Sequence, residues 1–572
     1  MVPSIHQINT VTGDIARNTE KIKKWILEDS KHGSFLSIFP ETAITGYMCG
    51  SLWDREDFIK DQVAEVYGIR TYLEEIDYKG TVILGFIDFL GMKKNGFPKL
   101  KNAAAIIDKV NVRIYHKQLL ASADHHEDKK YFEPGDHSLV FTCKVGDETR
   151  EVGVLICEDA WVSDHQRNIP DEMYSLGAEI LVHINQSYFY YGKQEKRLAL
   201  GKTIARNYKI PFVSVNAIGV GDILKNIVIF DGNSFIIDDE GNCAFVAPAF
   251  TEYNGKASIS DYNMYSPPSK YKEICDALLF EQREFFRLCG ISKAQVHVSG
   301  GLDSAIVAAL VAKSMGKENT ILITNPSDLN TKSLKYVEDL AKGLEMEYFT
   351  FPVQKIYDTF VTEFVASFGQ QLPLSGLSCA QATLRSVQGL VANHLFKSGI
   401  VATGNHTEIV LGWATFHDIG SIGTHALIGD LTKMELYELA RYINKFLYNK
   451  EVIPPDLFNG KFVPAAELPD AKEDPIDYTV QSGICAMLIR DRKNQRQILK
   501  EIYEEAPNPD YFPDIDEVRK YSKEGLKAQI EFAVKAMKRS VFKAGQAAPT
   551  VIISPRSRGF SNRETLINYY NI

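Results

Sequence analysis

Short apolar runs alternate with amphipathic stretches along roughly the first 260 residues of the chain. The apolar runs are rich in β-branched residues and predict strands over 35–39, 81–86, 103–107, 152–156, 180–184 and 212–215. Among the amphipathic stretches, the clearest begins after Asp14, a predicted N-cap, and runs to Lys31 with its large apolar residues on one face. Strands separated by helices indicate an α/β protein.

The pair Pro267-Pro268 interrupts this pattern, because proline continues neither a helix nor a central strand. We therefore expect a linker over residues 263–272 between domains at 1–262 and 273–572. The second region predicts a helix from about Glu273, a strand over 295–298, a glycine-rich turn and a helix from Ser304. The last 70 residues are charged and predict mostly helix, ending in an irregular segment near Pro555.

Composition narrows the class of protein. With 45% hydrophobic and 24% charged residues, the chain is not largely disordered. The net charge of −9 argues against nucleic acid as the main partner. The apolar runs are too short for a membrane span, and the N-terminus lacks a signal-peptide pattern. The eight cysteines form no CxxC pair, so we expect a cytoplasmic protein with reduced thiols.

A thiol, a carboxylate and an amine occur where apolar runs end in the first domain. Cys157 lies in GVLICEDAW, where two acidic residues follow it, Glu41 ends FLSIFPET, and Lys117 follows VRIYH. A nucleophilic thiol needs a base and a nearby positive charge that favours the thiolate. Taken singly, each residue is more often structural, as a buried inert thiol or a solvated charge.

Together, and in this order, FPETAITGY, HKQLL and ICEDAW resemble the nitrilase (carbon–nitrogen hydrolase) superfamily over roughly residues 1–260. The resemblance implies an α-β-β-α sandwich and a Glu-Lys-Cys triad. Cys157 would attack a carboxamide carbon, Glu41 would transfer protons, and Lys117 would stabilise the oxyanion. The further residues assigned to this site are Asp128, Tyr47, Trp161 and Ser187. Asp128 replaces the family's usual glutamate, and the chain departs from the Leu-Pro pattern at Ala121.

The segment VHVSGGLDSAIVAAL has the most specific pattern in the chain. A strand runs into two glycines, which let the backbone approach a ligand, and then into a helix whose free N–H groups face an anion. The alternative is a capped junction without a ligand, but SGGxDS is longer and rarer than an ordinary Gly-Gly turn. The segment therefore predicts a phosphate site.

SGGLDS resembles the pyrophosphate loop of the N-type ATP pyrophosphatases, which implies a Rossmann-like domain with a parallel sheet. Downstream, TGNHTEIVLGWAT, IGDLTKMELYELA and PAAELPD resemble segments of NAD synthetases. With a nitrilase-type domain in front, nearly the whole chain is similar to the glutamine-dependent NAD synthetase family. The resemblance implies a ligase that uses ATP and Mg²⁺ to amidate deamido-NAD with nitrogen from glutamine.

The resemblance also assigns residues to the second site. For ATP they are Ser299, Gly300, Gly301, Asp303, Ser304, Thr403 and Lys433. For deamido-NAD they are Arg385, Asn405 and Asp418, and for magnesium Asp303 and Glu408. The chain departs from the family at Thr383, where an arginine is usual, and near His417.

The resemblance thus implies glutamine, ATP and deamido-NAD as small-molecule partners, and we expect neither nucleic acid nor a membrane as a partner. It also implies a homo-oligomer, and we expect ammonia to pass between the two sites. Two alternatives remain. The chain could be another amidotransferase with an SGGxDS loop, one that acts on a different carboxylate or on tRNA. The negative net charge and the lack of a zinc knuckle count against tRNA. A non-enzymatic nucleotide-binding protein is disfavoured, since the chemical residues of both sites are all present.

Overall fold

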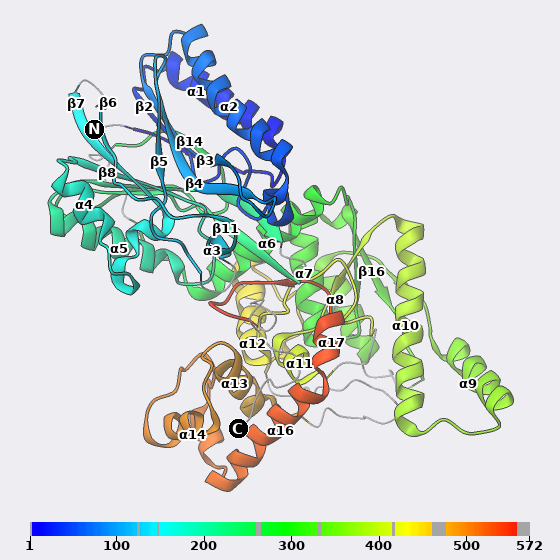
Figure 1. Cartoon of the computed structure of the whole chain (residues 1–572). Coiled ribbons are helices and arrows are strands. Elements are labelled where there is room, and N and C mark those ends of the chain that lie inside the picture. The colour runs from blue at the N-terminus through cyan, green and yellow to red at the C-terminus, as the bar shows by residue number, and fades with distance from the viewer. Residues whose placement is uncertain are drawn as a thin grey trace. The chain divides into compact units, whose positions relative to one another are not determined.

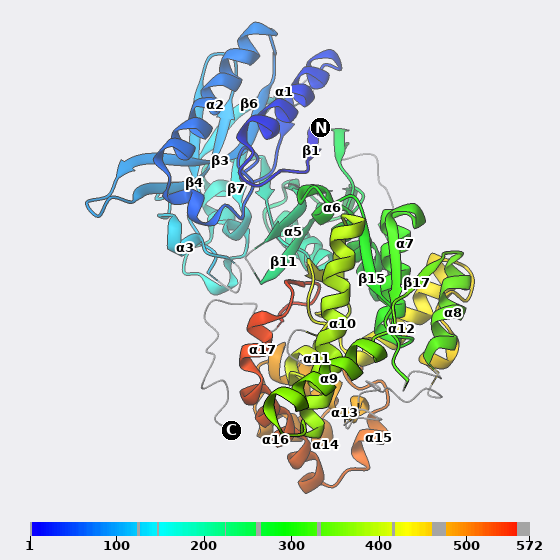
Figure 2. The same ribbon diagram turned by 90° about the vertical axis from the view of Figure 1, so that its right-hand side faces the viewer.

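The computed structural model describes residues 3–122, 126–145, 148–222, 225–258, 265–328, 333–413, 418–459, 469 and 476–557. The chain divides into two compact units, residues 1–223 with 228–268 and residues 224–227 with 269–572. Figures 1 and 2 show the elements of each unit. No helix of the described residues is long and apolar enough to cross a membrane.

Two six-stranded sheets form the first unit. One has the order β14-β1-β2-β3-β4-β5, with β14 (Tyr253–Lys256), β1 (Ser4–Gln7), β2 (Leu36–Ile38), β3 (Thr81–Met92), β4 (Pro98–Ile107) and β5 (Val112–His116). The other has the order β13-β12-β9-β8-β7-β6, with β13 (Cys243–Val246), β12 (Phe235–Ile237), β9 (Phe212–Asn216), β8 (Ile180–Asn185), β7 (Glu148–Ile156) and β6 (Val140–Val145). The central strands β1–β2–β3 and β7–β8–β9 are parallel, and the flanking strands are antiparallel.

Helices cover the outer faces of both sheets. The helices α1 (Ile15–Lys31) and α2 (Glu56–Glu75) pack on the first sheet, and α4 (Ile169–Ser175) and α5 (Lys193–Tyr208) pack on the second. The N-cap expected at Asp14 is present, since its side chain accepts a hydrogen bond from the backbone of Arg17. The unit is therefore the α-β-β-α sandwich that the sequence predicts, with apolar side chains of both sheets in one core.

The sandwich brings the ends of its parallel strands to one edge, as in other α/β folds. Glu41 follows β2, Cys157 follows β7, and Ser187 follows β8. Lys117 comes directly after β5, which pairs with β4 in the first sheet. The catalytic residues expected from the sequence thus leave strands of both sheets.

The second unit contains a parallel sheet. Its strands lie in the order β20-β19-β18-β15-β16-β17, with β20 (Thr550–Val551), β19 (His425–Ala426), β18 (Gly399–Ala402), β15 (Ala294–His297), β16 (Thr320–Thr324) and β17 (Tyr348–Thr350). After β10 (Ile218–Asp222), the strand β11 (Asn226–Asp231) begins with two residues that belong to this unit and pair with β20. A C-terminal segment therefore takes part in the sheet.

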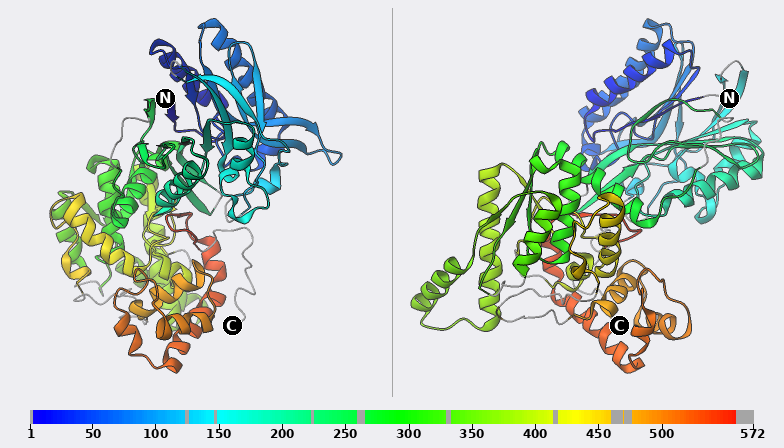
Figure 3. Two further views of the ribbon diagram at one scale, coloured as in Figure 1. Left: turned by 90° about the vertical axis from the view of Figure 1, so that its left-hand side faces the viewer. Right: turned by 180° about the vertical axis from the view of Figure 1, so that it is seen from behind.

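Helices flank this sheet and extend beyond it. The helix α7 (Leu302–Met315) packs on β15 and β16, and α6 (Lys270–Leu288), α8 (Ser333–Leu344) and α12 (Lys433–Tyr442) pack on α7. The start of α6 lies within the expected linker, of which residues 263–264 are outside the described residues. The long helices α9 (Gln354–Phe368) and α10 (Leu374–Phe396) form a pair, and α9 lies at the outer edge of its unit (Figures 1 and 3).

The chain after β18 is mostly helical, including the described part of the last 70 residues, for which the sequence predicts helices. Its helices are α11 (His406–Leu411), α13 (Tyr478–Ile489), α14 (Gln495–Glu504), α15 (Ile515–Arg519), α16 (Lys523–Arg539) and α17 (Val541–Gln546). Apolar side chains of α11, α13, α14, α15 and α16 share one core.

Candidate functional site

A buried carboxylate at the end of β2 is held on both oxygens. Oε1 of Glu41 accepts hydrogen bonds from Lys117 Nζ (2.9 Å) and Asn102 Nδ2 (2.8 Å). Oε2 accepts from the backbone N–H of Gln186 (2.9 Å). The neighbouring strand carries Gly85 here, where a Cβ would lie 2.5 Å from the Glu41 Cα. A larger residue would therefore displace this carboxylate.

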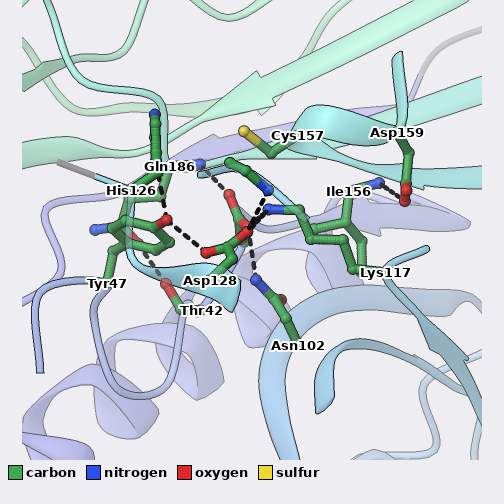
Figure 4. A network of polar contacts seen from close by, with 12 residues as sticks. Thr42, Tyr47, Asn102, Lys117, His126, Asp128, Ile156, Cys157, Asp159 and Gln186 are labelled. Carbon is green, nitrogen blue, oxygen red and sulfur yellow. Dashed lines mark hydrogen bonds and ion pairs between the residues drawn. The ribbon is translucent and has the colours of Figure 1, made fainter. Parts of the chain in front are cut away.

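Lys117 lies between two carboxylates. Its Nζ also donates to Oδ2 of Asp128 (2.7 Å), whose Oδ1 accepts from the Tyr47 hydroxyl (2.6 Å). Burial lowers the pKa of Lys117, but the charges of Asp128 and Glu41 outweigh it and hold the pKa well above its usual value. Burial likewise raises the pKa of Asp128, and Lys117 more than offsets that. The first site therefore contains a cation that carboxylates hold on two sides (Figure 4).

Cys157 begins the short 3₁₀ helix η2 (Cys157–Ala160), directly after β7. Its φ of 45° lies in the left-handed region, which non-glycine residues seldom adopt. Its carbonyl accepts a hydrogen bond from His183 Nε2 (2.8 Å), and its side chain is buried. Burial and the charge of Glu41 raise the thiol pKa well above its ordinary value, despite Lys117. The expectation that Lys117 favours a resting thiolate is therefore corrected: the resting thiol is protonated.

Asp159 joins the two catalytic loops, a role that the sequence analysis missed. Its Oδ1 accepts from the backbone N–H groups of Gln118 (3.0 Å) and Leu119 (2.8 Å). Its Oδ2 accepts from the backbone of Ile156 (3.0 Å) and the Tyr115 hydroxyl (2.8 Å). Burial raises the pKa of Asp159 to about 6. An acidic residue three positions after a buried strand was the only signal in the sequence.

Aromatic side chains surround a second amine beside this site. Lys193, the first residue of α5, has its Nζ 5.2 Å from the ring centroid of Trp161, 5.8 Å from that of Tyr188 and 4.9 Å from that of Tyr190. Burial lowers the pKa of Lys193 to about 8. Among the described residues, no carboxylate forms an ion pair with it. The sequence analysis missed Lys193, because a single lysine after a glycine carries no signal of its own.

Ser187 and Trp161, both expected at this site, line one small pocket. The other lining residues are His183, Asn185, Arg197, Leu200, Ser214 and Phe235. The backbone of Ser187 is fixed at both ends, since its N–H donates to Asn216 Oδ1 (2.9 Å) and its carbonyl accepts from Arg197 (2.9 Å). Ala121, the departure after Lys117, donates its backbone N–H to Asp128 (3.3 Å).

In the second unit, the SGGLDS segment joins β15 to α7. Gly300 has a φ of 87°, and a Cβ there would lie 2.3 Å from the carbonyl oxygen of Ser333. The hydroxyl of Ser304 accepts from the backbone of Ser299 (3.2 Å) and donates to the carbonyl of Gly301 (3.1 Å). Gly301 is the N-cap of α7 and offers no side-chain acceptor, so the first N–H groups of the helix remain available to an anion.

Charged residues converge at the start of α7. Lys433 Nζ donates to Oδ2 of Asp303 (2.6 Å), whose buried Oδ1 has no partner among the described residues. Glu408 accepts from the backbone of Asn405 (3.2 Å) and from the Tyr478 hydroxyl (3.4 Å). Burial lowers the pKa of Lys433, but Asp303 and Glu408 outweigh it and raise the pKa. The described residues contain no group of three or more His, Cys, Asp or Glu arranged for a metal.

The remaining expected residues of this unit come from a strand end, a loop and a helix. Thr403 follows β18 and donates its N–H to the carbonyl of Gly420 (3.1 Å), and Asp418 accepts from the N–H of Gly420 (3.4 Å). Arg385, on α10 two residues after Thr383, donates to the carbonyl of Asn325 (3.1 Å). Burial raises the pKa of Asp418, and the charge of Arg385 opposes it. His417 and most of the PAAELPD segment lie outside the described residues.

Comparisons with known proteins identify relatives of both parts of the chain. The carbon-nitrogen hydrolase family model matches residues 4–260, and the NAD synthase model matches residues 273–513. A glutamine-dependent NAD(+) synthetase of Synechocystis sp. is 28% identical over 527 residues, which cover 88% of this chain and 90% of that protein. This chain belongs to the glutamine-dependent NAD(+) synthetase family. A family member from Acinetobacter baylyi is 28% identical over 514 residues, which cover 87% of this chain and 89% of the relative.

Solved structures of the family share the fold. The glutamine-dependent NAD+ synthetase of Acinetobacter baumannii, solved in complex with ADP, has a TM-score of 0.72 at 22% identity and covers 100% of this chain and 99% of its own. The synthetase of Cytophaga hutchinsonii has a TM-score of 0.80 at 17% identity, covering 99% of this chain and 98% of its own.

Proposed function

We propose that this ligase forms NAD by ATP-dependent amidation of deamido-NAD, with nitrogen taken from glutamine. The observation that carries the proposal is that a buried Glu41–Lys117–Cys157 cluster and a glycine loop at a helix start occur in one chain of this family. The purified chain should convert deamido-NAD, ATP and glutamine into NAD, AMP, pyrophosphate and glutamate. Amidation of another carboxylate or of tRNA, with deamido-NAD untouched, would overturn the proposal.

In the first unit, Cys157 Sγ attacks the carboxamide carbon of glutamine while Glu41 takes the thiol proton. The buried, protonated thiol requires such a base, because it holds no resting thiolate. The oxyanion forms beside Lys117, whose charge Asp128 and Glu41 maintain. Glu41 returns the proton to the departing ammonia, which leaves a thioester that water hydrolyses to glutamate.

Lys193 binds the α-carboxylate of glutamine. It is a half-buried ammonium beside the catalytic cysteine, surrounded by aromatic faces rather than by an acid of the described residues. An incoming carboxylate would supply the missing counter-charge and so gain more than it would at an exposed lysine. Trp161 and Tyr190 would then exclude water from this ion pair.

In the second unit, the loop at Ser299–Ser304 and the start of α7 hold the phosphates of ATP. A magnesium ion fits here, because Asp303 leaves one buried oxygen without a partner and Glu408 lies close enough to affect Lys433 electrostatically. When bound, the ion neutralises phosphate charge as pyrophosphate leaves. The carboxylate of deamido-NAD attacks the α-phosphorus, and ammonia then displaces AMP from the acyl adenylate. Lys433 supplies further positive charge at the phosphates.

Ammonia formed at Cys157 passes to the adenylate without mixing with the solvent. Ammonia released into water near neutral pH becomes mostly ammonium, which has no lone pair and cannot attack the adenylate. Direct transfer would keep the ammonia unprotonated and reactive. Synthesis from ¹⁵N-amide glutamine in excess unlabelled ammonium should give NAD that keeps the label. A product labelled in proportion to the bulk ammonium pool would contradict direct transfer.

The chain forms homo-oligomers through α9 and α10. None of the residues of α9 is buried, and the exposed residues Val387, Val391 and Leu395 follow helical spacing along α10. Exposed apolar side chains of this kind mark interaction surfaces. Sedimentation should show a dimer or larger species that Val391→Asp with Leu395→Asp dissociates. A wild-type monomer at micromolar concentration would overturn this assignment.

A further inference from the structure

His126 lies against two tyrosines of the first site. Its Nδ1 is 2.9 Å from the hydroxyl of Tyr47. Its ring centroid is 5.0 Å from that of Tyr188 and 5.7 Å from that of Tyr47. Figure 4 shows His126 in the same network as Tyr47, Asp128 and Lys117. No step of the mechanism above uses this imidazole.

The hydrogen bonds determine which ring nitrogen carries the proton. The Tyr47 hydroxyl donates its only proton to Asp128 (2.6 Å), because an ionised carboxylate can only accept. The contact between Tyr47 and His126 therefore requires Nδ1–H of the imidazole as donor. Burial lowers the pKa of His126 to about 4, so the ring is neutral near pH 7. Nε2 is then left with a lone pair and can only accept a hydrogen bond.

The His126 ring and the Lys193 amine both lie near the ring of Tyr188. Lys193 Nζ is 5.8 Å from the Tyr188 ring centroid, and the His126 ring is 5.0 Å from it. Glutamine carries its α-carboxylate and α-ammonium on one carbon, so the groups that bind them must lie close together. A cation and a neutral acceptor on one tyrosine match this arrangement of charges.

We propose that His126 selects glutamine over simple amides by accepting a hydrogen bond from the substrate's α-ammonium at Nε2. The inference rests on the proposed glutaminase activity of Cys157 and deepens it. His126 is thus a specificity residue that touches the substrate away from the reacting carbon. The competing role would be positional, in which Nδ1–H only orients Tyr47 and, through it, Asp128.

Two amide substitutions separate these roles. In His126→Asn the side-chain N–H₂ reaches the position of Nδ1 and can still donate to Tyr47, but nothing replaces Nε2. In His126→Gln the longer amide places a carbonyl oxygen near the position of Nε2 and loses the contact with Tyr47. Each variant is assayed with glutamine and with glutaramate, which has the same amide and carboxylate but no ammonium. The readout is the rate of release of glutamate or glutarate.

His126→Asn should raise KM for glutamine about ten- to hundredfold with kcat little changed, as expected for a lost hydrogen bond to a charged group. Its kcat/KM for glutaramate should stay near the wild-type value, and His126→Gln should keep the preference for glutamine. Unchanged turnover of glutaramate, together with ammonium-dependent NAD synthesis, shows that the variants are folded. An unchanged preference in His126→Asn, or an equal loss for both substrates, would overturn the proposal. Failure of the proposed function would look different: wild-type glutamate release would not depend on Cys157.

Discussion

The two sites differ in how completely their carboxylates are engaged without a ligand. In the first unit, each oxygen of Glu41 and Asp128 accepts a hydrogen bond from the protein. In the second, Oδ1 of Asp303 is buried without a partner among the described residues. A buried polar atom left unpaired costs about 1–3 kcal/mol, which a ligand can recover. The protein alone thus satisfies the carboxylates of the glutaminase site before substrate binds. In the nucleotide site, a ligand is needed to satisfy the carboxylate of Asp303.

The largest effect should follow from Asp303→Asn, which keeps the shape of the side chain but removes its charge. Loss of several kcal/mol of phosphate stabilisation predicts a fall of about 10³-fold or more in NAD formation. Glutamine and ammonium should be affected alike, because both need the adenylate. Release of AMP measures the defect, and far-ultraviolet circular dichroism checks the fold. Near-normal synthesis from ammonium would show that Asp303 only caps α7.

A smaller but more selective effect is expected from Lys117→Met. The substitution removes the positive charge that stabilises the oxyanion, so it should lower glutamine-dependent synthesis by about 10²- to 10³-fold. The two buried carboxylates that Lys117 separates would lose their counter-charge, so the first unit should also become less stable. Synthesis from ammonium should persist in the same preparation. An equal loss with both nitrogen sources would place Lys117 outside the glutaminase step.

Asp159→Asn tests whether the first site depends on its supporting loop. An amide can accept at only one of its two atoms, so it cannot replace the bonds that Asp159 accepts at both oxygens. We expect a loss of about 1–3 kcal/mol in unfolding free energy and at least a tenfold fall in glutaminase kcat. Thermal unfolding and glutamate release measure the two effects. Tyr115→Phe, which removes one of these bonds, should cost less; the reverse ranking would contradict the account.

The smallest effect is a pH dependence. Lys193, with its pKa of about 8, loses its charge as the pH rises through that value, so carboxylate binding should weaken on the alkaline side. With glutaramate, which has no amine to titrate, KM should rise about five- to sixfold between pH 8 and pH 9 and stay nearly level below pH 7. Lys193→Arg keeps its charge and should show a flat profile. A flat wild-type profile would exclude Lys193 from carboxylate binding.

Residues next to strand ends could be located from the sequence. The runs that end at Glu41 and Cys157 are strands β2 and β7, and Lys117 directly follows β5. The SGGLDS pattern likewise marked the turn between β15 and α7, because its glycines and helix start are local features. Where a functional residue belongs to a short local segment, the pattern of apolar and polar residues is enough to locate it.

Residues that act through distant partners could not be found this way. Asp159 bonds to the backbone of Gln118, and Lys193 lies against Trp161, so each depends on contacts between separate elements. The charge of Lys117 was expected to favour the thiolate of Cys157, yet burial of the thiol outweighs that charge. Burial and tautomers are properties of the folded chain. A sequence pattern supplies the nucleophile but not its protonation state.

The most direct test of two separate chemical sites is NAD synthesis by Cys157→Ala with two nitrogen sources. Only the glutaminase step needs a covalent nucleophile, so the variant should lose synthesis from glutamine. Synthesis from a high concentration of ammonium should stay within about threefold of the wild type, because any ammonia that reaches the adenylate can react. The ammonium assay also controls for misfolding. Full retention of glutamine use, or equal loss of both activities in the soluble variant, would contradict the account.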